Sequence, residues 1–146
     1  MRFWDAPPST DVAETEARIT ASRAVDPLIH AAFAVVDRAC GDVVGMVNYR
    51  VRQSAHGRLA IGWIVVPSWR RNGIAREAAG VLIRRCFTVL ASNRIEARIA
   101  PDNRASLQLA ERVGFHREGL MREWAMVDGT PRDMLLFALL RSDWSG

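Results

Sequence analysis

The spacing of apolar residues changes several times along the chain, and each change marks a predicted element. Helical spacing follows a capping signal at Asp11 and Glu14 and stops at Asp26-Pro27. Three short runs rich in Val, Ala and Ile come next, separated by Gly-containing turns, which predicts an antiparallel meander. The three predicted strands cover residues 29–36, 43–51 and 58–66.

In the second half, a broad apolar stripe predicts a helix over residues 74–91. A strand over residues 95–100 follows, and a strand, a helix and a strand in succession favour a parallel crossover. A short helix and a hairpin around Asp128-Gly129 complete the pattern, over residues 103–113, 118–127 and 132–140. We therefore predict one α/β (α+β) domain over residues 1–146, with a mixed central sheet flanked by helices.

Composition narrows the class of protein. The chain has 146 residues, of which 49% are hydrophobic, and this suits one domain with a real core. Its formal charge is +4 and every basic residue is Arg, which excludes a lysine base or Schiff base. Neither a membrane span nor a signal peptide is indicated, so the predicted compartment is the cytoplasm. The two Cys and three His are isolated, and neither a disulfide nor a metal site is predicted.

The stretch over residues 64–75 gives the clearest indication of a binding site. A strand runs into a Pro turn, a basic Gly-containing loop and a helix. Unpaired backbone N–H groups and the helix dipole favour an anion such as a phosphate at such a helix start. Gly73 permits positive φ, and Arg70 and Arg71 add forked donors. By itself the pattern also fits an ordinary turn with a solvated basic rim.

The same stretch resembles the acyl-CoA pyrophosphate loop of the GCN5-related N-acetyltransferase (GNAT) superfamily, Arg/Gln-x-x-Gly-x-Gly/Ala, at Arg70, Gly73 and Ala75. Segments 101–106, 111–115 and Arg132-Asp133 resemble the branch that acetylates the N-termini of ribosomal proteins. The resemblance covers about residues 29–144. It implies a splayed GNAT sheet, acetyl-CoA as cosubstrate without a metal, and direct attack of a primary amine in a ternary complex. The amine would be a protein N-terminus or a small molecule.

The resemblance also implies a set of binding residues. The backbone of β-strand residues would hold the thioester and pantetheine, the loop would hold the pyrophosphate, and Asn103 would bond the pantetheine amide. Ser106 would donate to the departing sulfur. Ordinary alternatives are a core strand, a helix N-cap at Asn103 and a Ser bonded to backbone. The implied cofactor-binding residues are Ile64, Val65, Val66, Arg70, Arg71, Asn72, Gly73, Ile74, Ala75, Asn103 and Ser106.

The sequence does not assign the general base that would take the proton of the amine. At two positions where family members place a Glu, this chain has Ala60 and Ala125. Glu96 and Glu123 are alternatives, although each also fits an ion pair with a neighbouring Arg. Glu96 is out of phase with its apolar neighbours and should face the other side of the sheet. A chain of water molecules would need no dedicated base.

The acceptor side is indicated only by the resemblance. It places Arg122 and Trp124 beside the acceptor, and Asp133 either in a structural hydrogen bond or in acceptor binding. It also implies that the usual first strand and helix are missing here, since the chain starts near where they would end. Their loss leaves a sheet edge to be covered, for which a homodimer is one means.

Two other classes of function are weighed. The Ala residues at positions 60 and 125 favour an acetyl-CoA-binding or dimerising interaction module without turnover. Arg70-Arg71 and Arg84-Arg85 are the only clusters that favour nucleic acid, and no recognition motif accompanies them. We therefore expect no nucleic-acid or membrane partner.

Overall fold

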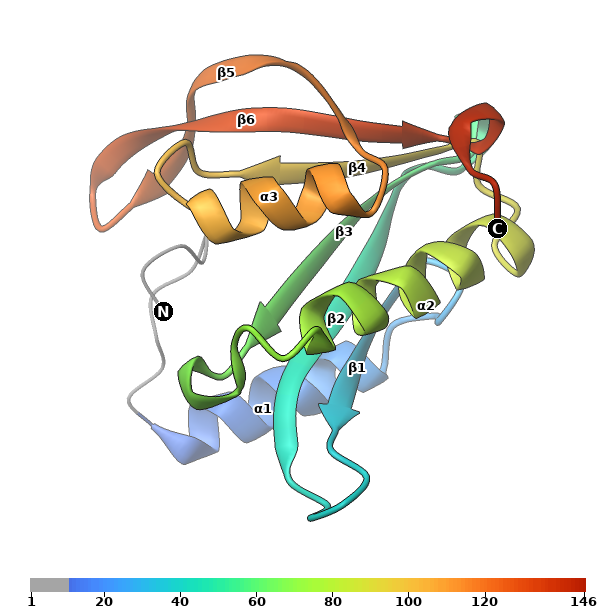
Figure 1. Ribbon diagram of the computed structural model, residues 1–146. Coiled ribbons are helices and arrows are strands. Elements are labelled where there is room, and N and C mark those ends of the chain that lie inside the picture. Colours follow the sequence, from blue (N-terminus) through green and yellow to red (C-terminus); the bar gives the residue numbers. More distant parts are fainter. Residues whose placement is uncertain (1–10) are drawn as a thin grey trace.

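A computed structural model describes residues 11–146. Its six strands form a single mixed sheet in the order β1-β2-β3-β4-β6-β5, with α2 and α3 on one face (Figure 1). The strands are β1 His30–Val36, β2 Val43–Gln53, β3 Arg58–Val65, β4 Arg94–Ile99, β5 His116–Val127 and β6 Thr130–Leu140. The helices are α1 Val12–Arg23, α2 Ile74–Thr88 and α3 Arg104–Arg112. This is the predicted order and the predicted fold class.

Local signals act as predicted at several boundaries. The Asp11 carboxylate accepts a hydrogen bond from Ala13 N at 2.9 Å, so it caps α1. Asp128 and Gly129 have φ of 49° and 72° and form the two-residue turn between the last two strands. A register shift lies beside Gly45, where the glycine in the strand suggests a bulge. The register of β1 with β2 shifts at Val44, while a Cβ on Gly45 would stand 2.5 Å from the Ile64 carbonyl oxygen, so close strand approach requires the glycine.

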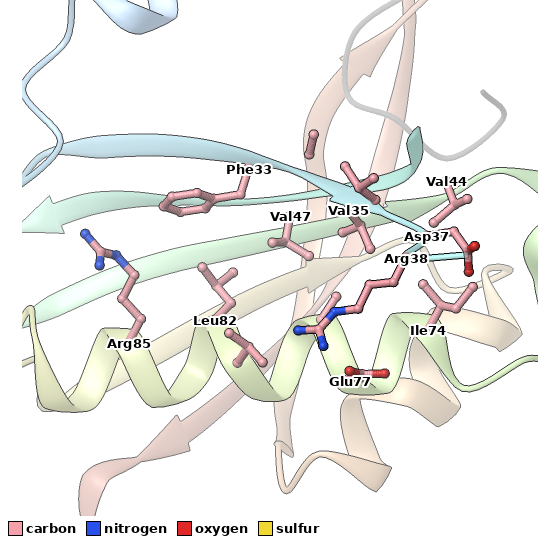
Figure 2. Close-up of a pocket in the computed structure, with 14 residues that line it drawn as sticks. Phe33, Val35, Asp37, Arg38, Val44, Val47, Ile74, Glu77, Leu82 and Arg85 are labelled. Atoms are coloured by element: carbon pink, nitrogen blue, oxygen red, sulfur yellow. The ribbon is translucent and has the colours of Figure 1, made fainter. Parts of the chain in front are cut away.

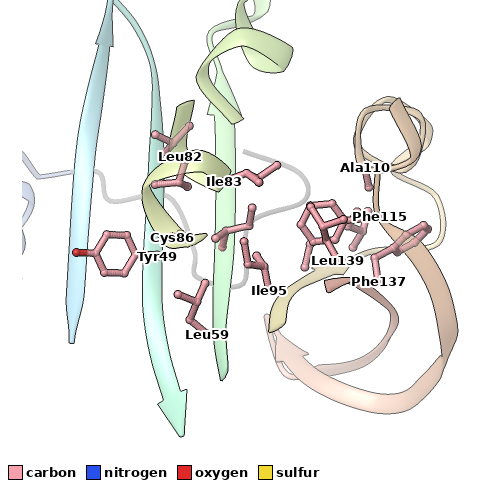
Figure 3. Close-up of a cluster of buried hydrophobic side chains, with 14 of the residues drawn as sticks. Tyr49, Leu59, Leu82, Ile83, Cys86, Ile95, Ala110, Phe115, Phe137 and Leu139 are labelled. Atoms are coloured by element: carbon pink, nitrogen blue, oxygen red, sulfur yellow. The ribbon is translucent and has the colours of Figure 1, made fainter. Parts of the chain in front are cut away.

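The core lies between the sheet and the helices α2 and α3 (Figure 3). Helix α2 buries Leu82, Ile83, Cys86 and Phe87 along one stripe, as the helical spacing predicts. Burial raises the pKa of the Cys86 thiol to about 12, so this Cys is an inert core residue. Within residues 11–146, no helix is long and apolar enough to cross a bilayer.

Strands β3 and β4 are the parallel pair at the centre of the sheet, and they pair only briefly. Their register covers Arg58↔Arg94, Leu59↔Ile95 and Ala60↔Glu96. Beyond Ala60 the two strands diverge into a V, which Figure 1 shows opening toward the start of α2. Residues 61–65 of β3 therefore have no β-strand partner on the β4 side.

Candidate active site

The loop between β3 and α2 offers a row of backbone donors. Pro67–Trp69 form one turn of 3₁₀-helix, and Arg71 and Gly73 then adopt positive φ of 69° and 78° before α2 begins at Ile74. The Gly73 carbonyl accepts from Arg76 N and Glu77 N at 2.9 and 3.0 Å. In the described chain, no backbone carbonyl accepts from the amides of residues 71–75. These donors, at the positive end of α2, suit an anion such as a phosphate group.

Side chains add positive charge and keep the loop open. Arg70 Nε donates to the Val65 carbonyl at 3.3 Å, which ties the loop to the end of β3. Arg71 is exposed at the rim. A Cβ built on Gly73 would meet no atom within 4 Å, so the space in front of this glycine is empty. The predicted loop residues are thus brought together beside the V.

On the other arm of the V, the first turn of α3 holds Asn103 and Ser106. Asn103 is the helix N-cap, and its Oδ1 accepts from Ser106 N at 3.2 Å. The alternative predicted for Asn103 is therefore present, and it leaves the amide nitrogen of the side chain for another partner. Ser106 Oγ does not follow the predicted bond to backbone. It accepts instead from Trp63 Nε1 at 3.3 Å.

Glu96 lies at the vertex of the V and faces away from α2, as its phase along the strand predicts. It is 4% exposed. Its Oε1 lies 2.9 Å from Arg94 Nε and 3.3 Å from Arg58 Nε, and its Oε2 lies 3.4 Å from Arg98 Nη2. The predicted ion pairs with arginines of the same strand are confirmed. The pair with Arg58 of β3 was not predicted, because it depends on the strand register.

The ion network continues from Arg94 to β5. Arg94 Nη1 donates to Glu118 Oε1 at 2.8 Å, and Nη2 lies 2.5 Å from Oε2. This bidentate ion pair lowers the pKa of the Glu118 carboxyl and raises the pKa of the Arg94 guanidinium. One buried carboxylate and one surface carboxylate therefore join β3, β4 and β5 on the face opposite α2.

Strand β5 carries an irregular segment where the acceptor residues are predicted. Its register with β6 shifts between Met121 and Ala125, and Glu123 has φ of 49°. Asp133 Oδ1 accepts from Glu123 N at 2.8 Å, so the structural role weighed for Asp133 is present. Trp124 is 40% exposed, with the Arg98 guanidinium 4.6 Å above its ring. Arg122 is exposed on the same segment.

From the sequence, Trp63 could line an acceptor pocket, like the other four Trp residues, or lie in the core, and no partner is predicted for it. Its alternation with Leu59 and Ile61 places it on the α2 side of β3, and this signal was available. Its partner Ser106 was not foreseeable, because the two residues are 43 positions apart. Trp63 also packs edge-on against Phe115, with ring centroids 6.4 Å apart.

A hollow also lies elsewhere, between β1 and α2 (Figure 2). Its volume is about 640 Å³ and its walls are mainly apolar. It touches the loop site only at Ile74, and it contains none of the polar groups that converge on the V. The polar groups described above converge at the V and not in this hollow, so the V is the candidate site.

Comparison with known proteins gives a consistent answer. A model of the acetyltransferase (GNAT) domain matches residues 1–116. An uncharacterized N-acetyltransferase p20 of Bacillus licheniformis is 32% identical over 114 residues, covering 78% of this chain and 64% of that protein. The [ribosomal protein uS5]-alanine N-acetyltransferase of Escherichia coli is 31% identical over 115 residues, covering 77% and 59%.

Solved structures agree with these relatives. The structure of Mycobacterium smegmatis RimJ in complex with CoA-disulfide superposes with a TM-score of 0.85 at 29% identity, over 96% of this chain and 71% of that one. The chain spans less than two thirds of the length of the curated relatives just described. The matched domain, the splayed sheet and the loop before α2 lead to one conclusion: the chain belongs to the GNAT family of acetyltransferases.

Proposed function

We propose that this chain is an N-acetyltransferase that moves an acetyl group from acetyl-CoA to a primary amine, in a ternary complex in the cytoplasm. One observation carries the proposal. The gap between β3 and β4 opens directly beside a loop whose amides, over residues 71–75, have no acceptor in the described chain. Such a gap can take an extended pantetheine, and such a loop can take a diphosphate.

The residues that would hold acetyl-CoA follow from this placement. Backbone groups of Ile64, Val65 and Val66 border the gap and would bind the pantetheine and thioester. The loop amides and the guanidinium groups of Arg70 and Arg71 would hold the diphosphate. Asn103, whose Oδ1 is engaged with Ser106 N, can still donate through its amide nitrogen. The bound cosubstrate supplies the reactive thioester, and the chain supplies position and charge.

In the transfer, the amine nitrogen bonds to the acetyl carbon, the C–S bond breaks and the electron pair leaves on sulfur. The amine gives up one proton to a base or to water. We propose Ser106 as the hydrogen-bond donor to the sulfur. Glu96 and Glu123 stay the proposed bases, but Glu96 contacts three guanidinium groups. The amine proton could instead pass to Glu123 or to a chain of water molecules, and either path leaves these ion pairs intact.

The acceptor would approach on the face opposite α2, between the vertex of the V and the irregular segment of β5. Trp124 and Arg122 are the proposed contacts there. The E. coli relative that acts on ribosomal protein uS5 favours a protein N-terminus. A small amine is the alternative, because substrate choice varies on one fold.

Binding and turnover test the proposal separately. We expect acetyl-CoA to bind in a calorimetric titration, and an analogue lacking the diphosphate and adenosine to bind far more weakly. We also expect free thiol to appear when acetyl-CoA is mixed with a panel of peptides and small amines. If acetyl-CoA binds tightly but no free thiol appears with any amine of the panel, the alternative is favoured, an acetyl-CoA-binding interaction module. A folded chain that does not bind acetyl-CoA would contradict both.

We further propose that the chain forms a homodimer through the free edge of β1. Within residues 11–146, this strand pairs only with β2, contains no charged residue, and exposes Phe33 and Val36 by 37% and 49%. The hollow in Figure 2 continues this apolar surface toward α2. An apolar edge that is not paired with a further strand invites such pairing, and a second copy offers the same edge in antiparallel orientation.

The oligomer can be tested with a charge placed on this edge. Ala34→Lys would set two lysines near each other across the two-fold axis, so we expect the mass measured by light scattering to fall from dimer to monomer. Ala39→Lys, in the exposed turn after β1, is the matched control and should leave the mass unchanged. A monomeric unmodified chain would contradict the proposal directly.

A further inference from the structure

A side-chain hydrogen bond joins the two arms of the V. Trp63 lies on β3, three residues beyond the last residue that pairs with β4. Its Nε1 reaches Ser106 Oγ, in the first turn of α3, at 3.3 Å. The bond therefore crosses the gap on the helix side, next to the backbone of Ile64.

The chemistry of the two groups sets the direction of this bond. An indole N–H can only donate, so the Ser106 oxygen must accept. The hydroxyl proton of Ser106 is then free to point elsewhere. A Ser or Thr inside a helix often donates this proton to the carbonyl four residues earlier, as Thr88 at the end of α2 does with Arg84 O at 2.8 Å. For Ser106, no acceptor of its proton is found within residues 11–146.

Two further contacts fix the geometry. The Trp63 ring packs edge-on against Phe115, which is buried in the core. Asn103 Oδ1 holds Ser106 N at 3.2 Å, so the Ser backbone is held by the helix cap. Phe115 thus holds the Trp63 ring, and Asn103 holds the Ser106 backbone. The rotation of the Ser106 hydroxyl proton is the motion that these contacts leave open.

We infer that Trp63 is a positioning residue that makes Ser106 a donor toward the gap between β3 and β4. The inference rests on the proposed function, in which Ser106 stabilises the departing sulfur. Occupying one lone pair of Oγ with the indole donor directs the O–H away from the helix and toward the gap. The same bond makes the hydroxyl a better donor, because hydrogen bonds in a chain polarise one another. A donor fixed in advance costs no reorganisation during the reaction.

The bond itself can be tested without any substrate. The chain has five Trp, so its ¹⁵N-labelled form should give five indole N–H signals. Trp63→Phe removes one signal and identifies it, while keeping a ring to pack on Phe115. We expect Ser106→Ala to move that signal and to leave the Trp144 signal in place. If Ser106→Ala does not move the Trp63 signal, the inference is overturned.

The catalytic consequence needs a double-mutant cycle. Acid–base assistance contributes roughly 10²-fold or more to rate, so we expect Ser106→Ala to lower kcat by about that factor, with the KM for acetyl-CoA little changed. Trp63→Phe should lower kcat by about tenfold, and the double variant should fall no further than Ser106→Ala. Trp144→Phe is the matched control, because Trp144 packs on Phe87 at 5.1 Å, away from the V, and it should keep full rate.

Different results would contradict the proposed acetyl transfer and the positioning role of Trp63. If the unmodified chain transfers no acetyl group, the proposed function fails, and the indole signals still decide whether the bond exists. If the chain is active and Ser106→Ala keeps full kcat, or if the losses of the two single variants multiply, the positioning role of Trp63 is overturned.

Discussion

Glu96→Ala is expected to destabilise the fold by about 3 to 5 kcal/mol, the usual cost of removing one partner from a buried ion pair. The carboxylate is 4% exposed and contacts three guanidinium groups. Without it, Arg58, Arg94 and Arg98 would repel one another at the point where β3 and β4 still pair. Urea or thermal unfolding measures this loss, which corresponds to a fall in Tm of roughly 10 °C or more for a domain of this size.

Two further variants test whether burial of the carboxylate causes the loss of stability expected for Glu96→Ala. Glu96→Gln keeps the shape and one acceptor oxygen, so its loss should be smaller than that of Glu96→Ala. Glu118→Gln removes the other carboxylate of the same network, but its side chain is 40% exposed. Exposed ion pairs contribute about 0 to 1 kcal/mol, and we expect no more than that here. Equal losses at positions 96 and 118 would contradict the central role of the buried carboxylate.

Gly73→Glu is expected to weaken the binding of acetyl-CoA by at least about tenfold. Two effects act together. A residue with a Cβ pays about 1 to 2 kcal/mol in left-handed backbone, and Gly73 has φ of 78°. The new carboxylate would also point into the empty space in front of the loop amides, where it repels a diphosphate. A calorimetric titration measures the change, in which about 1.4 kcal/mol equals a factor of ten.

The chain supplies matched controls for this variant. Gly80→Glu adds the same charge to the same helix at an open, exposed position without positive φ, and should bind as the unmodified chain does. Gly73→Ala keeps the backbone strain without the charge and should lie between the two. If Gly73→Glu and Gly80→Glu bind acetyl-CoA equally well, the diphosphate is not held at this loop.

Local signals were sufficient for most elements and for the loop. Asp11 caps α1, and Asp128-Gly129 forms the last turn, because capping and turn chemistry depend on a few neighbouring residues. Periodicity predicted the buried stripe of α2, and the position of Glu96 on the face opposite α2, for the same reason. The Gly73 loop before α2 was predicted from spacing alone. Its assignment to acetyl-CoA came from the family resemblance.

Other features depend on which strands become neighbours. The order β4-β6-β5 brings Glu118 to Arg94, and the short register of β3 with β4 brings Arg58 to Glu96. The irregular segment of β5 is not predictable from its own residues, because a register shift exists only relative to the partner strand.

The sequence by itself determined the order of elements, the core faces and the donor-rich loop, since each is written in residues close together along the chain. The tertiary structure alone decided how the two arms of the V are connected. Trp63 and Ser106 carry no mutual signal in the sequence, and they meet because β3 and α3 are packed against the same core around Phe115. Packing places one indole N–H against one hydroxyl oxygen, and no local pattern encodes that distance.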